Sequence, residues 1–96
     1  MKAKEWIDAA KKKSGISSDY AIAKRLGMTQ SAVSNIRNSE STLSDEYAVE
    51  VARVLGIDPL HVIIDQHRER TTNECAREAW ERLGKRIDFA NGALVF

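Results

Sequence analysis

The fold is decided by residues 19–38, which read DYAIAKRLGMTQSAVSNIRN. Apolar residues recur at helical spacing on both sides of Gly27, so the segment predicts two short helices joined by a tight turn. Helices joined by so short a turn cross closely, and Ala23 supplies the small side chain that the crossing requires. Gly27 supplies the positive φ that the turn requires. The apolar residues expected to hold the two helices together are Ile22, Leu26, Val33 and Ile36.

The second of these helices has an outer face that is polar but uncharged. Its side chains are Gln30, Ser31, Ser34 and Asn35. A helix face that is merely solvated more often carries Lys and Glu. Amides and hydroxyls, by contrast, pair with base edges in the major groove of DNA. We therefore predict that these four residues contact the bases of double-stranded DNA.

The segment resembles the helix-turn-helix family of phage Cro and repressor proteins and their bacterial relatives. The residues that carry the resemblance, at the family's spacing, are Ile22-Ala23, Leu26-Gly27, Thr29-Gln30-Ser31, Val33-Ser34 and Ile36. In outline the resemblance extends from Trp6 to about Ile64, since an order of five helices also fits. It implies an all-α, five-helix repressor-like domain that places its recognition helix in the major groove and binds operator DNA as a homodimer.

Capping residues and glycines divide residues 1–70 into those five helices. The expected helix starts are Ala3, Ser17 or Ser18, Thr29, Ser44 and Asp58-Pro59, and the expected ends of the first four helices are Ser14-Gly15, Gly27, about Arg37 and Gly56. A polar loop is expected over residues 38–42. The apolar faces expected outside the central hairpin are Trp6, Ile7 and Ala10; Tyr47, Ala48, Val51, Ala52 and Leu55; and Leu60, Ile63 and Ile64.

Residues 71–96 are expected to form a separate dimerisation element. A sixth helix starting at Thr71 or Thr72 would align Ala76, Ala79, Trp80, Leu83 and Ile87. Asn91-Gly92 between short apolar runs predicts a β-hairpin in the tail. The residues predicted to form the dimer interface are Trp80, Leu83, Phe89, Leu94 and Phe96. The alternative is that the tail folds back and enlarges the core of its own subunit.

Phosphate contacts are expected on both sides of the recognition helix. The predicted residues are Ser18, Tyr20, Lys24, Arg37, Asn38, Ser39 and Thr42. Asp19 departs from the family, which often has Gln at the start of the first motif helix to grip phosphate. A carboxylate there would repel DNA, so backbone N–H groups beside Ser17 or Ser18, or the Tyr20 side chain, would have to replace that grip.

Charge distribution and composition bear on whether the chain could bind a polyanion, span a membrane, hold a metal or act as an enzyme. Residues 1–43 carry a net charge of +4 and the remainder −3, which suits a chain that presents one end to a polyanion. No apolar run reaches the roughly 18 residues of a membrane span, and the single Cys75 favours a cytoplasmic protein in which it is a small core or interface residue. His61 and His67 share no helix face, so no metal site is expected, and no catalytic group, cofactor motif or small-molecule site is recognised.

The predicted function is therefore sequence-specific transcriptional regulation, in the form of a phage or prophage repressor that binds a pseudo-palindromic operator. An antitoxin that represses its own operon is one alternative, with the acidic second half as its toxin-binding surface. A protein-interaction module that uses the same hairpin without binding DNA is another.

Overall fold

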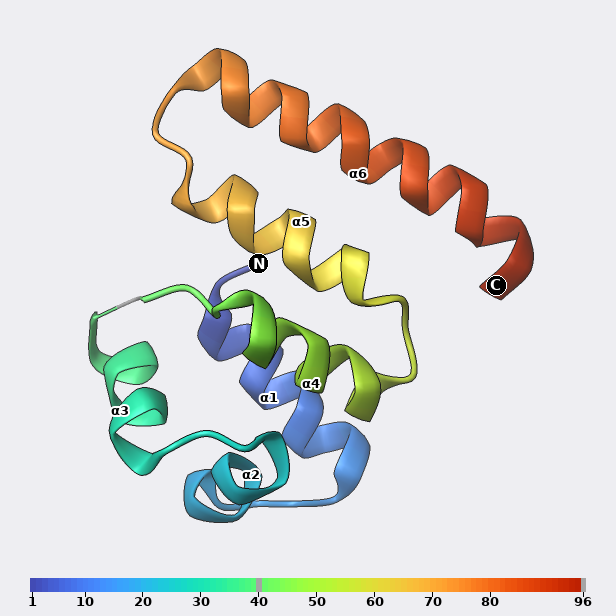
Figure 1. Cartoon of the computed structure of the whole chain (residues 1–96). Helices are drawn as coiled ribbons and strands as arrows, with labels where there is room; N and C mark the ends of the chain where they lie inside the picture. The colour runs from blue at the N-terminus through green and yellow to red at the C-terminus, as the bar shows by residue number, and fades with distance from the viewer. Residues whose placement is uncertain (40, 96) are drawn as a thin grey trace.

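The chain folds into six helices, seen here in a computed structural model (Figure 1). The structure describes the backbone of residues 1–39 and 41–95. Within these ranges, side chains are described as far as Ile87. The helices are α1 (Ala3–Ser14), α2 (Asp19–Leu26), α3 (Gln30–Ser39), α4 (Asp45–Leu55), α5 (Pro59–Arg70) and α6 (Glu74–Val95). No strand occurs in this described part, and the all-α prediction is confirmed.

Side-chain caps start four of the helices as the sequence predicts. The accepting atoms are Ser18 Oγ for the N–H of Ala21 (3.0 Å), Thr29 Oγ1 for Ala32 (3.0 Å), Ser44 Oγ for Tyr47 (3.3 Å) and Asp58 Oδ1 for Leu60 (2.9 Å). The turn between α2 and α3 has Gly27 at a φ of 70°, the left-handed conformation expected there.

The five helices α1 through α5 share one apolar core. The four residues predicted to hold α2 and α3 together, Ile22, Leu26, Val33 and Ile36, are all at most 4% exposed. They pack against residues of α1 and α4, among which Ile7, Ala10, Ala48 and Val51 are fully buried. The central hairpin is thus fixed to the rest of the domain by its inner face, which leaves its outer face to solvent.

The face that α5 buries differs from the prediction. Leu60 is 44% exposed, whereas Val62 is fully buried in the core. The reason is that α5 lies between α4 and α6 and so has two packed faces (Figure 1). Val62 and Gln66, four residues apart, share the face toward the core, while Ile64 lies against Gly84 of α6.

The predicted end of α3 and the predicted start of α6 are each wrong by two residues or more. Helix α3 continues through Ser39, so the predicted loop begins later. Helix α6 starts at Glu74, because Asn73 Oδ1 accepts the N–H of Ala76 at 3.0 Å. The Thr71 hydroxyl is instead used at the end of α5, where it donates to the carbonyl of His67 at 2.7 Å.

The predicted hairpin at Asn91-Gly92 is wrong. The backbone of α6 is helical from Glu74 through Val95. Extending an existing helix adds a hydrogen bond for each residue fixed, whereas a lone two-stranded hairpin is only marginally stable, so the helix prevails over the local turn signal. The predicted stripe on α6 is also rotated: Ala76, Trp80 and Ile87 are half-buried, but Ala79 and Leu83 are exposed.

Gln66 is a fully buried polar residue that ties α5 to the segment after α3. Its Oε1 accepts the N–H of Leu43 at 2.9 Å, and its Nε2 donates to the carbonyl of Met1 at 3.0 Å and to Asp65 Oδ2 at 3.2 Å. Arg70, one turn further along α5, binds the same residue, because its Nη1 donates to the carbonyl of Leu43 at 3.2 Å. Together they fix the end of the loop that leaves α3.

Replacing Gln66 should therefore destabilise the fold. In Gln66→Leu the buried N–H of Leu43 loses its partner, which should lower the free energy of unfolding by about 1–3 kcal/mol in urea denaturation. Gln30→Leu makes the same chemical change on an exposed residue and should alter it by less than about 0.5 kcal/mol. Equal unfolding midpoints for the two variants would contradict this role of Gln66.

Candidate nucleic-acid interface

The outer face of α3 gathers the four residues predicted to contact bases. Gln30, Ser31, Ser34 and Asn35 are all exposed, whereas Val33 and Ile36 behind them are 2% and 4% exposed. Residues four apart are neighbours on a helix surface, so Gln30 lies beside Ser34 and Ser31 beside Asn35. The result is a compact patch of amides and hydroxyls on the first two turns of α3.

A groove between α2 and α3 borders this patch. It is lined by Asp19, Tyr20, Gln30, Val33, Ser34 and Arg37. Tyr20 is 53% exposed, and Lys24 Nζ lies 5.1 Å from the centroid of its ring. The phenol and the ammonium group therefore stand together on α2, and Tyr20 shares the groove with Gln30.

The start of α2 combines a cap with a charged cluster. Ser18 Oγ accepts the N–H of Ala21, and its own hydroxyl proton is still able to donate to a phosphate oxygen. Asp19, one residue later, receives two cations: Lys11 Nζ at 2.9 Å from Oδ1, and the Arg37 guanidinium across both carboxylate oxygens. Arg37 Nη2 also lies 2.7 Å from Asp8 Oδ1 on α1.

These contacts shift the acid–base properties of the cluster. Hydrogen bonds from Arg37, and then from Lys11, lower the pKa of Asp19 from 3.8 to about 2. The hydrogen bond from Arg37 also lowers the pKa of Asp8, and the two carboxylates raise the pKa of Arg37. Asp8, Asp19 and Arg37 are thus charged at neutral pH, and the two carboxylates of the cluster are paired with two basic side chains. The carboxylate that the sequence suggested would repel DNA is neutralised within the fold.

Three more predicted phosphate ligands lie at the far end of α3 and in the segment that follows it. Asn38 Nδ2 donates to Ser34 Oγ at 3.2 Å, and Ser39 Oγ donates to the carbonyl of Asn35 at 2.6 Å. Both side chains are exposed, and Thr42 is half-buried in the segment that leads to Leu43. Each of these residues follows or flanks the patch on α3.

A family model for helix-turn-helix proteins of the Cro/repressor type matches residues 7–62, more than half of the chain. The chain belongs to the phage Cro/repressor-like helix-turn-helix family. This family comprises DNA-binding transcriptional regulators, and the match runs from α1 into α5. No curated protein and no solved structure matches the chain.

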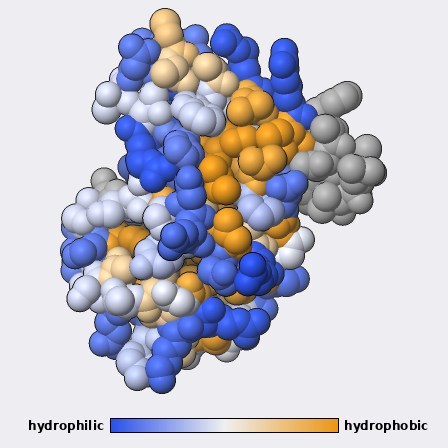
Figure 2. Space-filling model, in the orientation of Figure 1, coloured by the Kyte–Doolittle hydropathy of each residue, from blue (hydrophilic) through white to orange (hydrophobic). Residues whose placement is uncertain are grey.

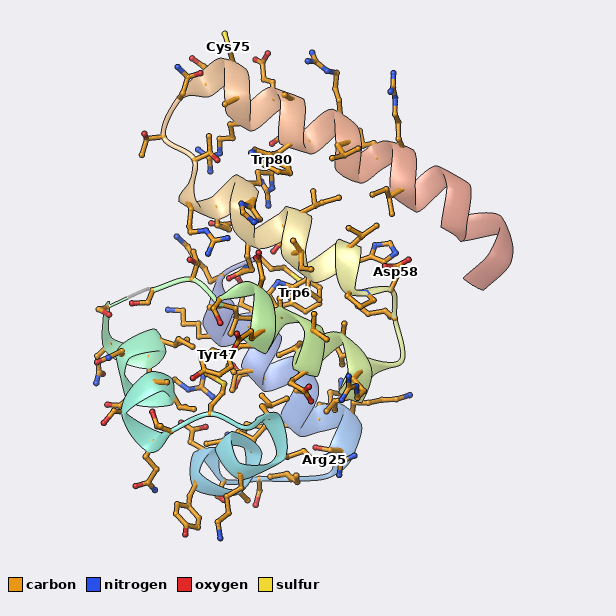
Figure 3. The ribbon with its side chains drawn as sticks, viewed as in Figure 1. Trp6, Arg25, Tyr47, Asp58, Cys75 and Trp80 are labelled. Carbon is orange, nitrogen blue, oxygen red and sulfur yellow. The ribbon has the colours of Figure 1, made fainter. Side chains whose placement is uncertain are left out.

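The helix-turn-helix match ends before α6, which packs mainly on α5. Trp80 points from α6 toward α5, where its ring stacks on His67 with centroids 4.9 Å apart (Figure 3). Leu83 is 41% exposed. Phe89 and Leu94 belong to the part of α6 whose side chains are not described, and Phe96 lies outside the described residues.

The remaining predictions from the sequence concern Cys75, metal binding and membrane spans. Cys75 is exposed at the start of α6 and points away from α5, so the prediction of a core position is wrong; a helix that buries only the side toward α5 leaves this position in solvent (Figure 3). Among the described residues, no three His, Cys, Asp or Glu side chains are grouped as a metal site would need. None of the helices in that part of the chain combines the length and apolarity needed to cross a membrane.

Sequence reasoning missed the cluster around Asp19. Its members come from three helices, and Asp19 and Arg37 are 18 residues apart. No spacing rule for one helix links such positions. The only local signal was the unexpected carboxylate at the start of α2.

The cluster makes a prediction for acid unfolding. Because the folded state lowers the pKa of Asp19, this group stabilises the fold above its unfolded pKa of about 3.8, and that stabilisation is lost as the pH falls toward 2. Asp19→Asn should therefore be less stable than the wild type at pH 6 and lose less stability between pH 4 and pH 2. Urea midpoints measured across this range test it. Parallel curves for the two proteins would contradict the assignment.

Proposed function

We propose that the chain is a sequence-specific repressor, of phage or prophage origin, that binds a pseudo-palindromic operator as a homodimer. The observation that carries the proposal is the exposed, uncharged patch of Gln30, Ser31, Ser34 and Asn35 on α3. In the family's docking geometry α3 enters the major groove, where these amides and hydroxyls meet base edges.

Phosphate contacts on both sides of the patch complete the interface. On the α2 side they come from the Ser18 hydroxyl, the Tyr20 phenol and the Lys24 ammonium group, all of which are exposed. On the other side they come from Asn38, Ser39 and Thr42. A recognition helix flanked in this way is held between the two backbones that border a major groove.

We also propose that residues 71–96 form a dimerisation element distinct from the DNA-binding unit of residues 1–70. Apolar surface gathers where α6 meets α5, on the face shown in Figure 2. Trp6, Leu60, Ile64, Trp80 and Ile87 line a groove there. Leu60, which lines this groove, is 44% exposed, and Leu83, next to Gly84 of the groove, is 41% exposed. Apolar surface that is gathered in one exposed patch, rather than scattered as single residues, is typical of a subunit contact.

Loss of a base contact should show as loss of preference for one sequence. After selection of bound sites from random duplex DNA, Gln30→Ala and Asn35→Ala should each weaken binding to the selected site by about 1–3 kcal/mol. Binding to random DNA should barely change, because phosphates dominate it. Thr72→Ala removes an exposed polar group away from α3 and serves as the control. Unchanged affinity of both variants for both DNAs would contradict the assignment of α3.

The dimer prediction is tested at an exposed position, so that the subunit itself stays folded. Leu83→Glu should raise the dimer dissociation constant at least about tenfold in sedimentation equilibrium, because it places a charge in an apolar contact. Arg82→Gln lowers the net charge by the same amount at a neighbouring exposed position that lies on the other side of α6 from α5. This control should remain as dimeric as the wild type. A Leu83→Glu protein that is equally dimeric would place the interface elsewhere.

A further inference from the structure

Arg37 joins three helices through two carboxylates. From α3 its Nε and Nη2 donate to Asp19 Oδ2 and Oδ1 at the start of α2, at 3.1 and 2.9 Å. The same Nη2 donates to Asp8 Oδ1 of α1 at 2.7 Å. The side chain of Arg37 is 25% exposed, less than those of Asp19 (42%) and Asp8 (59%). The guanidinium group of Arg37 is therefore turned toward the protein, where it binds the two carboxylates.

The position of Arg37 on α3 decides which part of the recognition face it can control. At about 100° per residue, a side chain seven positions after Gln30 points within about 20° of it. Ser34 lies on the same edge, and all three residues line the groove between α2 and α3. A constraint on Arg37 is thus a constraint on the edge of α3 that presents Gln30 and Ser34.

Apolar packing alone does not supply this constraint. The shared burial of Ile22 and Val33 in one core brings α2 and α3 together, but the hydrophobic effect has no direction and tolerates small rotations of one helix against another. A guanidinium group that spans both oxygens of a carboxylate has a planar, two-point geometry. It therefore sets the rotation of α3 about its own axis as well as its distance from α2.

The cluster is also poorly suited to bind phosphate itself. Its charges cancel, and a phosphate that approached Arg37 would have to displace the Asp19 carboxylate and would face Asp8. Lys11, the second cation, is held on Asp19 Oδ1.

We infer that Arg37 is a positioning residue, which acts through Asp19 to fix the edge of α3 that carries Gln30 and Ser34, and is not a phosphate ligand. The inference rests on the proposed base contacts of α3. It gives Asp19 a definite use: at the position where relatives often grip phosphate, this chain holds its own recognition helix.

Arg37→Lys separates the two roles, because Lys keeps the charge and loses the two-point geometry. Fluorescence anisotropy would give the affinity of the full chain for its selected duplex and for random duplex DNA over a range of salt concentrations. We expect the ratio of these affinities to fall roughly 5- to 150-fold, the range for one lost bidentate base contact, at an unchanged salt slope. Asp19→Asn should lower the same ratio, because Asn accepts only part of the guanidinium.

A double-mutant cycle gives the second readout. If Arg37 acts through Gln30, Gln30→Ala should cost little more in the Arg37→Lys background, whereas independent contacts would add. Arg53→Lys makes the same substitution at an ion-paired arginine on α4 and should leave the ratio unchanged. Urea midpoints of each variant show that the domain is folded at the assay temperature.

The results that would overturn the inference differ from the result that would overturn the proposed base readout. The inference is overturned if Arg37→Lys leaves the ratio unchanged, or if both affinities fall together with a salt slope shallower by about one for each lost phosphate contact. An increase in both affinities for Asp19→Asn, at an unchanged ratio, also overturns it. Wild-type protein that does not distinguish its selected duplex from random DNA would instead overturn the proposed base readout, and with it the role of Arg37.

Discussion

Helix α3, the proposed recognition helix, is too short to be stable by itself. Helices α2 and α3 span 8 and 10 residues, and isolated helices of fewer than about 12–15 residues are marginal in water. Both depend on the burial of one apolar side against α1 and α4, where Ile22 and Val33 are almost completely enclosed. This division of labour lets the outer side of α3 consist of serines and amides, which contribute little to helix stability.

The features that were predictable from sequence are those that one helix and its neighbours determine. Ser44 and Thr29 act as caps because a hydroxyl just before a helix meets free N–H groups, and Gly27 turns the chain because it tolerates positive φ. These local rules located five helices and identified which face of α3 is exposed to solvent. They also explain why the family resemblance and the structure agree from α1 to α5.

The features that sequence reasoning missed depend on contacts between distant residues. The amide of Gln66 reaches Leu43, 23 residues earlier, and its burial follows from the position of α5 between two layers rather than from any local pattern. The helix at Asn91-Gly92 has a different cause, because there the propagation of α6 overrides the local turn signal. At the candidate site, the polar patch on α3 was foreseen, but the partners of Arg37 were not, since Asp8 and Asp19 belong to other helices.

The exposure of Cys75 has a practical consequence for following the protein in solution. It is the single cysteine of the sequence, and it stands in the first turn of α6, away from the α1–α4 core. A thiol-reactive fluorophore or nitroxide would therefore mark one defined point on α6 without further engineering. Two such labels in an assembly would report the separation of their α6 helices directly. Accessible thiols form disulfides with one another when they are oxidised, so measurements of assembly require a reducing agent.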